Sequence, residues 1–376
     1  MTLLAPPQPA PPSPAANAPL VIPRSAGFWA ETWIRFRRRR LSLAALVNVG
    51  LLCLVAIFSP AIAGTRPIVC KYKGKLYFPC MYYFNDSWQN PIFTADKFRG
   101  KFHDSLKAKD PESWAIWPLS FNDPYYSVQK DLWPGRPANP NQDKGRPSAQ
   151  NWLGTDQKGV DVFAKLVHGT RTALVVGFIS MGIAAAIGIT LGAIGGYMGG
   201  WVDTLLSRFT EAVMCIPTLP LLIAMMVLVT HPTIWHMMAV IGLLGWTSIA
   251  RLTRAEFLRL KESDFVAAAR VLGVSHGRII FRHILPNAMA PVLVPITFGI
   301  AGAIFTENAL TFLGFGPPPP TTSWGDMLKD GRSNYDLWWL IVFPGLAVFV
   351  TVLAYNLIGE GLQEATDPRL RDGGRK

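Results

Sequence analysis

Six apolar stretches separated by polar segments make up the pattern of this chain. The first runs from about Leu41 to Ala63, and five more occupy residues 171–197, 207–230, 236–252, 288–308 and 337–359. A helix needs about 17–25 predominantly apolar residues to cross the hydrocarbon core of a bilayer. The pattern therefore predicts an all-α integral membrane protein with six transmembrane helices.

The composition agrees with a membrane protein. Only 16% of the 376 residues are charged, whereas a soluble protein carries about 25%. A net charge of +12 also occurs in nucleic-acid-binding proteins, but here the bases flank the apolar stretches and do not form one patch. Membrane topology requires that distribution.

The arginines ahead of the first span fix its orientation. The segment IRFRRRR, from Ile34 to Arg40, precedes it, and each arginine at a bilayer centre costs about 2.5–3.5 kcal/mol on insertion scales. The cluster therefore stays in the cytoplasm and the first helix runs outward. Six spans then place both chain ends and residues 253–287 in the cytoplasm. The bases of that loop agree: Arg254, Arg259, Lys261, Arg270, Arg278 and Arg282.

Five regions follow from this topology. Residues 1–33, which include PPQPAPPSPAANAP, are expected to form a disordered cytoplasmic tail, because they lack apolar periodicity. Residues 34–63 form the first transmembrane helix, and 64–165 form a periplasmic insert. Residues 166–360 form a five-helix core that contains the cytoplasmic loop 253–287, and 361–376 form a cytoplasmic tail.

Two features inside the spans bear on helix packing. Gly188, Gly192 and Gly196 recur at every fourth position, a spacing that lets two helices approach closely. The neighbour is either a helix of the same chain or a partner subunit. Pro217 and Pro220 remove backbone donors from the third span, so a kink is expected there.

The cytoplasmic loop has the pattern of a short helix. Ser263 or Asp264 can cap its N-terminus, and Gly273 stands where a helix end favours the left-handed conformation. Between them, apolar residues recur at i, i+3, i+4 and i+7 and so share one face: Phe265, Ala268, Ala269 and Leu272.

A second short helix is predicted after it. Ser275 caps this helix, Ile279, Ile280 and Ile284 form its apolar set, and Pro286 ends it. Neither helix can span a bilayer, and the apolar side of the pair must be buried. It packs either against the chain's own membrane helices or against another protein.

The loop sequence VAAARVLGVSHGRIIFRHILPN resembles the EAA loop of bacterial ABC importer permeases. That motif reads roughly Glu-Ala-Ala, three residues, Gly, and a downstream Leu-Pro. Residues 267–269 are all alanine here, Gly273 takes the glycine position, and Leu285 and Pro286 supply the end. Ala267 stands where the family has glutamate, which removes one charged contact.

The resemblance extends over about residues 150–370. LGTDQKGVDV before the second span and ENALTFLGFGPPPPTTSWG after the fifth are similar to the peptide and nickel branch, which includes OppC- and DppC-like permeases. RPIVCKYKGKLYFP and RPSAQNWLGTD in the insert resemble the microcin C/oligopeptide subgroup, the YejE-type permeases. The resemblance implies a type I ABC importer (MetI-like) permease core.

This resemblance also implies a function and partners. Such a chain is the permease subunit of a binding-protein-dependent importer that carries peptides or peptide-like compounds across the bacterial inner membrane. It pairs with a homologous second permease, two ATP-binding subunits and a periplasmic solute-binding protein. Its cytoplasmic loop is the coupling helix that docks on the ATPase. Seven residues are expected to make that contact: Phe265, Ala268, Ala269, Arg270, Leu272, Gly273 and Arg278.

The energy for transport is expected to come from those partners. The chain has no GxxxxGK[ST] phosphate loop and no arguable catalytic triad, so we expect no enzymatic activity and no cofactor of its own. ATP and Mg²⁺ then belong to the ATPase subunits. The histidines are scattered, and the one close pair, His231 and His236, is expected to be solvated and not to bind metal.

An ion- or proton-driven secondary transporter or channel is the alternative function. Such proteins place carboxylates or histidines in mid-span, whereas the mid-span positions here are nearly all apolar or small. Glu307, near the outer end of the fifth span, either lines a substrate path or caps local backbone.

The periplasmic insert begins with a predicted hairpin. With its turn at residues 73–74, Cys70 faces Tyr77 and Cys80 faces residue 67. A disulfide bond between Cys70 and Cys80 would require a looser turn, so their pairing is left open.

The insert is also rich in tryptophan, which suggests two roles. It forms either a cap beside the pore mouth that helps to dock the solute-binding protein, or a cover that anchors at the lipid interface. The tryptophans concerned are Trp88, Trp114, Trp117, Trp133 and Trp152.

Overall fold

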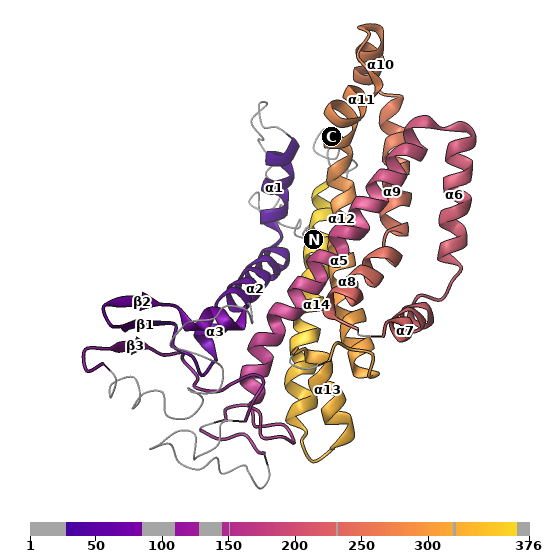
Figure 1. Ribbon diagram of the computed structural model, residues 1–376. Helices are drawn as coiled ribbons and strands as arrows, with labels where there is room; N and C mark the ends of the chain where they lie inside the picture. Colours follow the sequence, from indigo (N-terminus) through magenta and orange to yellow (C-terminus); the bar gives the residue numbers. More distant parts are fainter. Residues whose placement is uncertain are drawn as a thin grey trace, which may run out of the picture.

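The computed structural model of the protein describes residues 28–84, 110–127, 145–149, 151–230, 232–318 and 321–366. Trp88, Trp133 and His231 lie outside these ranges, as do residues 1–27 and 367–376. Long helices pack side by side, and a small sheet projects from one side of them (Figure 1).

The helices have the following bounds. They are α1 (Phe28–Arg38), α2 (Arg40–Ile57), α3 (Ser59–Ile62), α5 (Val162–Met198), α6 (Gly200–Met214), α7 (Thr218–Leu228), α8 (Ile234–Leu244), α9 (Thr247–Lys261), α10 (Asp264–Val271), α11 (His276–Arg278), α12 (Leu285–Phe312), α13 (Trp324–Ser333) and α14 (Trp339–Thr366). A π-helical turn, η4 (Ile279–Ile284), joins α11 to α12, and a 3₁₀ turn, η1 (Pro79–Tyr83), follows the hairpin.

Four helical segments are long and apolar enough to cross a membrane. They are α2, α5, the continuous segment His276–Phe312 and α14. Helices α6 and α7 make a fifth when taken together, and they are bent by 82° at the break between them. The break contains Pro217, the N-cap residue of α7, so the kink predicted from the prolines is present. The chain is a mostly helical, multi-pass membrane protein.

Several helices run beyond the apolar stretches that predicted them. Helix α1 begins at Phe28, inside the predicted tail, and α5 begins at Val162. Helix α9 continues to Lys261 and α14 to Thr366. The reason is that hydropathy marks only the part of a helix that lies in lipid, whereas hydrogen bonding carries the helix on into the polar regions.

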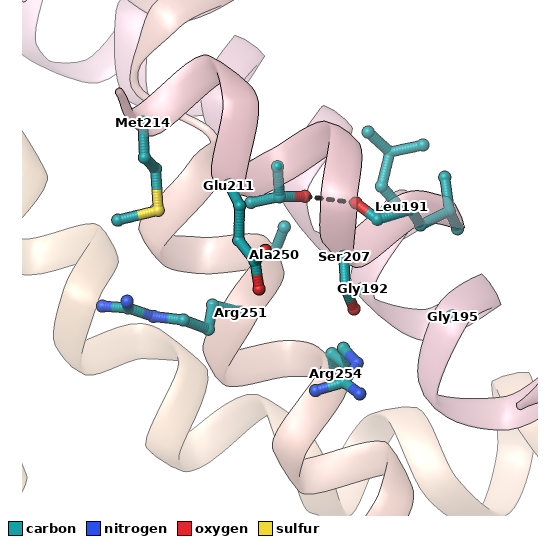
Figure 2. A pocket seen from close by; sticks show the side chains of 11 residues that line it. Leu191, Gly192, Gly195, Ser207, Glu211, Met214, Ala250, Arg251 and Arg254 are labelled. Atoms are coloured by element: carbon teal, nitrogen blue, oxygen red, sulfur yellow. Dashed lines mark hydrogen bonds between the residues drawn. The ribbon is translucent and has the colours of Figure 1, made fainter. Parts of the chain in front are cut away.

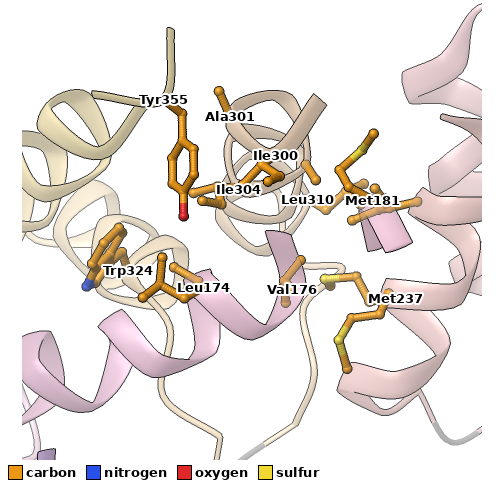
Figure 3. Close-up of a cluster of buried hydrophobic side chains, with 14 of the residues drawn as sticks. Leu174, Val176, Met181, Met237, Ile300, Ala301, Ile304, Leu310, Trp324 and Tyr355 are labelled. Carbon is orange, nitrogen blue, oxygen red and sulfur yellow. The ribbon is translucent and has the colours of Figure 1, made fainter. Parts of the chain in front are cut away.

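The core lies where α5, α12, α13 and α14 meet. Leu174 and Val176 of α5 lie near Ile304 of α12, Tyr355 of α14 and Trp324 of α13, and all five are buried (Figure 3). Helices in lipid gain little from the hydrophobic effect, so such contacts stabilise mainly through close packing.

The glycine repeat of α5 faces a helix of the same chain. A Cβ added to Gly188 would lie 2.7 Å from the carbonyl oxygen of Trp246, and one added to Gly192 would lie 2.5 Å from that of Ala250. Both neighbours belong to α9 or to the residue before it. The sequence left open whether the repeat packs against the same chain or against a partner subunit. In the structure it packs against a helix of the same chain.

The insert contains a three-stranded antiparallel sheet of order β2-β1-β3, built from β1 (Val69–Tyr72), β2 (Lys75–Tyr77) and β3 (Trp114–Ile116). The predicted hairpin register is confirmed, because Cys70 pairs with Tyr77 and the N–H of Cys80 donates to the carbonyl of Pro67 at 3.1 Å. Cys70 and Cys80 are free thiols.

Hydrogen bonds attach the base of this insert to α5. Nε2 of His168 lies 2.8 Å from the carbonyl oxygen of Ala63, and Nη1 of Arg171 donates to the carbonyl of Tyr83 at 2.9 Å. The hydroxyl of Tyr83 donates to Asp123 at 2.9 Å. The insert is thus fixed to the helices and does not hang from a single linker.

The start of α2 and the end of α14 lie next to each other. Arg39, at the junction of α1 and α2, pairs with Glu360 at 2.9 Å and with Glu364 at 2.7 Å. Close by, the hydroxyl of Ser42 donates to the carbonyl of Leu357 at 2.8 Å. The two helix ends therefore lie on the same side of the molecule.

Candidate functional site

The connection between α9 and α12, residues 262–284, begins with helix α10. Ser263 is its N-cap residue, one of the two predicted candidates. Its hydroxyl does not cap the helix and donates to the carbonyl of Leu260 instead. The backbone carbonyl of Ser263 accepts from Val266 and Ala267 at 3.0 Å, so the backbone alone forms the first turn.

Gly273 ends α10 in the way that the sequence predicts. Its φ is +71°, a left-handed conformation that glycine adopts without steric cost. The N–H of Gly273 donates to the carbonyl of Arg270 at 3.0 Å, and that of Val274 to the carbonyl of Ala269 at 3.1 Å. This pair of bonds is the Schellman motif, which satisfies the last carbonyls of a helix.

One side of α10 packs against the chain itself. Val266 and Ala269 are buried in a small cluster with Phe257, Ile279 and Ile284. The prediction that Ala269 shares an exposed docking face with Ala268 and Leu272 is therefore wrong. The regular i, i+3, i+4 pattern fits two faces of so short a helix, and only packing decides which face turns inward.

The other side of α10 and the turn after it are exposed and apolar. Val271 and Leu272 are 89% and 81% exposed, and Phe265 is 42% exposed. Ala268, Arg270, Gly273 and Arg278 are exposed as well. We call Phe265, Val271 and Leu272 the apolar tip; in Figure 1, α10 stands at one end of the molecule, beyond the other helices.

Pro286 does not end the second helix of the connection, contrary to the prediction. Helix α11 passes through η4 into α12 without a break, and Pro286 lies in the first turn of α12. Proline lacks an N–H and its ring crowds the preceding turn. The wider π-helical turn accommodates it, and Nδ2 of Asn287 donates to the carbonyl of His283 at 2.6 Å.

A second contact holds the connection in place. The hydroxyl of Tyr197, at the end of α5, lies 2.6 Å from Nδ1 of His276 in α11. Together with the buried side of α10, this hydrogen bond presents the apolar tip on a fixed base.

A cavity of about 210 Å³ lies between α5, α6 and α9 (Figure 2). Arg251, Arg254 and Glu211 point toward it among apolar side chains. Arg254 also pairs with Asp203 at 2.7 Å and so joins α9 to the start of α6. Ligand pockets usually measure about 300–1,000 Å³, so this cavity by itself does not indicate a substrate site.

At the opposite end, the LGTDQKGVDV segment and the residues before it build the entry to α5. Oδ1 of Asp161 accepts from the N–H of Ala164 at 2.7 Å and caps the helix, while Oδ2 accepts from Nδ2 of Asn151 at 2.6 Å. Gly154 has a φ of +83° and lies under Trp339, whose Nε1 donates to the carbonyl of Thr155 at 2.9 Å. These residues shape a loop and bring no reactive group together.

Glu307 lies inside the helix packing. It is fully buried, and its Oε1 accepts from the hydroxyl of Thr311 at 3.0 Å. Its partner is thus a side chain one turn along α12 and not the backbone that one prediction assigned to it. Among the described residues, no group of three or more His, Cys, Asp or Glu side chains is placed to hold a metal ion.

Comparison with known proteins decides the family. The sequence profile of the binding-protein-dependent transport system inner membrane component matches residues 188–372, and that of the N-terminal TM domain of oligopeptide transport permease C matches residues 27–73. The inner membrane ABC transporter permease protein YejE of Escherichia coli is 34% identical over 339 residues, which cover 89% of this chain and 96% of that protein. The chain belongs to this permease family.

Two further relatives agree. The dipeptide transport system permease protein DppC of Alkalihalophilus pseudofirmus is 40% identical over 62% of this chain and 77% of its own length. The peptidoglycan transport system permease protein YejE of Agrobacterium fabrum is 32% identical over 95% of this chain and 98% of its own length. The resemblance to DppC- and YejE-type permeases is confirmed. This family consists of transport subunits rather than enzymes.

In the structure of the permease, six of the seven predicted docking residues are exposed: Phe265, Ala268, Arg270, Leu272, Gly273 and Arg278. The structure adds Val271, the most exposed large apolar residue of the connection, which the helical pattern did not indicate. Its exposure follows from packing, because Val266 and Ala269 take the inward side of α10.

Proposed function

We propose that this permease is one of two homologous membrane subunits of an ABC importer for peptides or peptide-like compounds in the bacterial inner membrane. Two ATP-binding subunits would lie on the cytoplasmic side and a solute-binding protein on the periplasmic side. The substrate class is supported by the relatives, which are named as dipeptide and peptidoglycan transport permeases.

The proposed topology has six spans with both ends in the cytoplasm. Counting α6 with α7 as the third span and α8 with α9 as the fourth would complete the set that begins with α2 and ends with α14. The ion pairs of Arg39 with Glu360 and Glu364 support an even number of spans, because they join the start of the first to the end of the last.

The apolar tip carries the proposal for coupling. A pair of large apolar side chains exposed by 89% and 81% is costly in water, and exposed apolar surface of this kind marks an interaction site. Its base is held by Gly273, the buried face of α10 and Tyr197. A tip that is apolar at its end and rigid at its base suits a contact that transmits force to another protein.

In this proposal the partner ATPase subunits bind ATP and Mg²⁺, and this chain supplies no cofactor. Binding of ATP would draw the two ATPase subunits together and move the docked tips of both permeases. The membrane helices would then alternate between outward and inward access. The other function considered from the sequence, an ion- or proton-driven transporter or channel, is not supported by the family.

The test is Leu272→Glu in the complex reconstituted with its partner subunits. A charge at an apolar anchor of an interface typically costs about 1.4 kcal/mol or more, which is a tenfold loss of affinity. We expect at least that loss in binding of the ATPase subunits, together with loss of ATP hydrolysis that responds to the binding protein. Tyr335→Glu is the matched control, since Tyr335 is 80% exposed in the loop between α13 and α14. Unchanged ATPase binding and coupling in Leu272→Glu would refute the docking site.

The substrate class has a separate test. The solute-binding protein that works with this permease is purified without added ligand, and the compounds it retains are identified by mass spectrometry. Peptides or peptidoglycan fragments are the expected result. Retention of a sugar or a metal ion alone would contradict the proposed class while leaving the docking site untouched.

A further inference from the structure

The sheet of the insert has two different faces. On one face, Cys70 is fully buried in the centre of β1, and it is covered by Tyr72, Tyr77, Ala115 and Trp117. Side chains alternate along each strand, so the residues between these point the other way. The register places Leu76 and Trp114 on either side of Lys71, and Ile116 beside Val69.

This second face is apolar and exposed. Leu76 is 58% exposed, Trp114 45% and Ile116 52%. An antiparallel sheet with one face in water normally carries polar side chains on that face. Here the outward positions of the two outer strands are aliphatic or aromatic, although the inner face already has its own small core. We call Val69, Leu76, Trp114 and Ile116, with Lys71 between them, the outer sheet face.

The sheet is joined rigidly to the outer end of a membrane span. The N–H of Leu119 donates to the carbonyl of Ala61 at 3.1 Å, and that of Ser120 to the carbonyl of Ile62 at 2.8 Å. Ala61 lies only four residues beyond Ile57, where α2 ends. Leu119, Ile57 and Phe58 are themselves exposed. The apolar surface of α2 thus continues onto the segment that follows β3.

The position of the sheet favours lipid over the pore. Figure 1 shows it projecting sideways from α3, away from the helices α5, α12 and α14. A cap for the solute-binding protein would have to lie over the permease core, where the pore is formed. A sheet beside the first span lies over the surrounding bilayer.

The charges around the outer sheet face fit the same partner. Lys71 lies half-buried within the face, and Lys73 is exposed at the hairpin turn. Lysine extends its apolar stem along a membrane surface while its amine reaches the headgroups, and tryptophan prefers the same depth. Of the nearby acids, Asp110 is occupied in the hairpin turn, where its Oδ2 accepts from the N–H of Lys73 at 2.6 Å.

From these observations we propose that the outer sheet face binds the outer leaflet of the bilayer, with Leu76, Trp114 and Ile116 in the interfacial region and the lysines at the phosphates. The insert then anchors the first span laterally. This inference concerns a lipid contact and holds whichever substrate is carried.

Spin labels on adjacent residues of β2 test the proposal. Leu76→Cys places a nitroxide on the outer sheet face, and Lys75→Cys, the matched control, places one on the opposite face. Both are made in a Cys53→Ser, Cys215→Ser background, in which the remaining cysteines are buried. The assembled transporter is reconstituted in vesicles of phosphatidylethanolamine and phosphatidylglycerol, and its ATPase activity confirms the fold of each variant.

We expect the label at residue 76 to be relaxed more by oxygen, which concentrates in lipid, than by a water-soluble nickel chelate. The label at residue 75 should show the reverse. Ile116→Cys on β3 repeats the measurement on a second strand, in case one variant fails to assemble. Preferential relaxation by nickel at residues 76 and 116 would overturn the proposal. Protection from both reagents would also overturn it, since a protein surface would then cover the face.

Discussion

Gly273 is the residue whose backbone decides how α10 ends. Its φ of +71° turns the chain so that Leu272 stays outside while Val274 returns to the buried cluster. A Cβ at this position would meet no other atom within 4 Å. Only the backbone conformation therefore restricts the residue type at this position. Two substitutions of similar size, to valine and to asparagine, should for that reason differ in effect.

Gly273→Val should destabilise the turn, and Gly273→Asn should be tolerated. The left-handed conformation costs an ordinary L-residue about 1–2 kcal/mol, and more for a β-branched side chain, whereas asparagine adopts it readily. The valine variant is expected to lose coupling between ATP hydrolysis and the binding protein, and the asparagine variant to keep most of it. Equal coupling in the two variants would show that the turn does not need this conformation.

Cys70 gives a prediction for pH. Burial raises the pKa of its thiol to about 12, far above the ordinary value of about 8.5. Since the thiolate is the reactive form, Cys70 should resist alkylation by iodoacetamide near pH 9 in the folded protein and react after denaturation. Tyr335→Cys, at a position 80% exposed in the loop between α13 and α14, serves as the reference. Peptide mapping gives both alkylation rates. A Cys70–Cys80 disulfide in the map, or equal rates at residues 70 and 335, would contradict this prediction.

At the scale of the element, the structure separates what periodicity predicts from what packing decides. The four long apolar helical segments, the bend at Pro217 and the hairpin register follow from local sequence, because each depends on hydropathy or on the backbone chemistry of neighbouring residues. The inward side of α10 and the passage through Pro286 do not. Ala269 is buried in a cluster with Phe257 and Ile284, which come from other elements, and the helix continues through Pro286 because a π-helical turn precedes it.

The packing of α5 on α9 gives a prediction with an internal control. Gly192→Ala would place a Cβ 2.5 Å from the carbonyl oxygen of Ala250, whereas a Cβ at Gly182, in the same helix, meets nothing within 4 Å. Overpacking of this kind costs about 1–3 kcal/mol, while alanine in place of an unconstrained helical glycine is neutral or stabilises by up to about 1 kcal/mol. The thermal unfolding temperature of purified Gly192→Ala should be well below that of Gly182→Ala. A reversed or equal ranking would contradict the close approach of these helices.

At the scale of the whole molecule, the apolar tip and the insert lie toward opposite ends of the helices (Figure 1). The proposed topology places the tip in the cytoplasm and the loop that contains Tyr335 outside. In cells that express the permease without its ATPase subunits, Leu272→Cys should therefore react with a membrane-impermeant maleimide only after the cells are opened, and Tyr335→Cys should react in intact cells. Both side chains are exposed, so accessibility reports sidedness. Reaction of both variants in intact cells would refute the topology.

The unbroken passage from α11 through η4 into α12 has a mechanical consequence. The segment His276–Phe312 has 37 residues, which at 1.5 Å per residue is roughly 55 Å, so one continuous helical segment leads from the base of the apolar tip to the region of α13. It packs closely on α5 where Ile300 and Ile304 lie 3.0 Å from the position of a Cβ at Gly177. From His276 to Ile300 is 24 residues (300 − 276), and from Ile300 to Phe312 is 12 (312 − 300). A lever with this fulcrum reverses a displacement made at the tip and delivers about half of it beside α13. The test places one label at residue 278 and another at residue 313 and follows the displacement of each during ATP turnover. The two displacements should have opposite directions. Displacements in the same direction would mean that the helix translates as a whole.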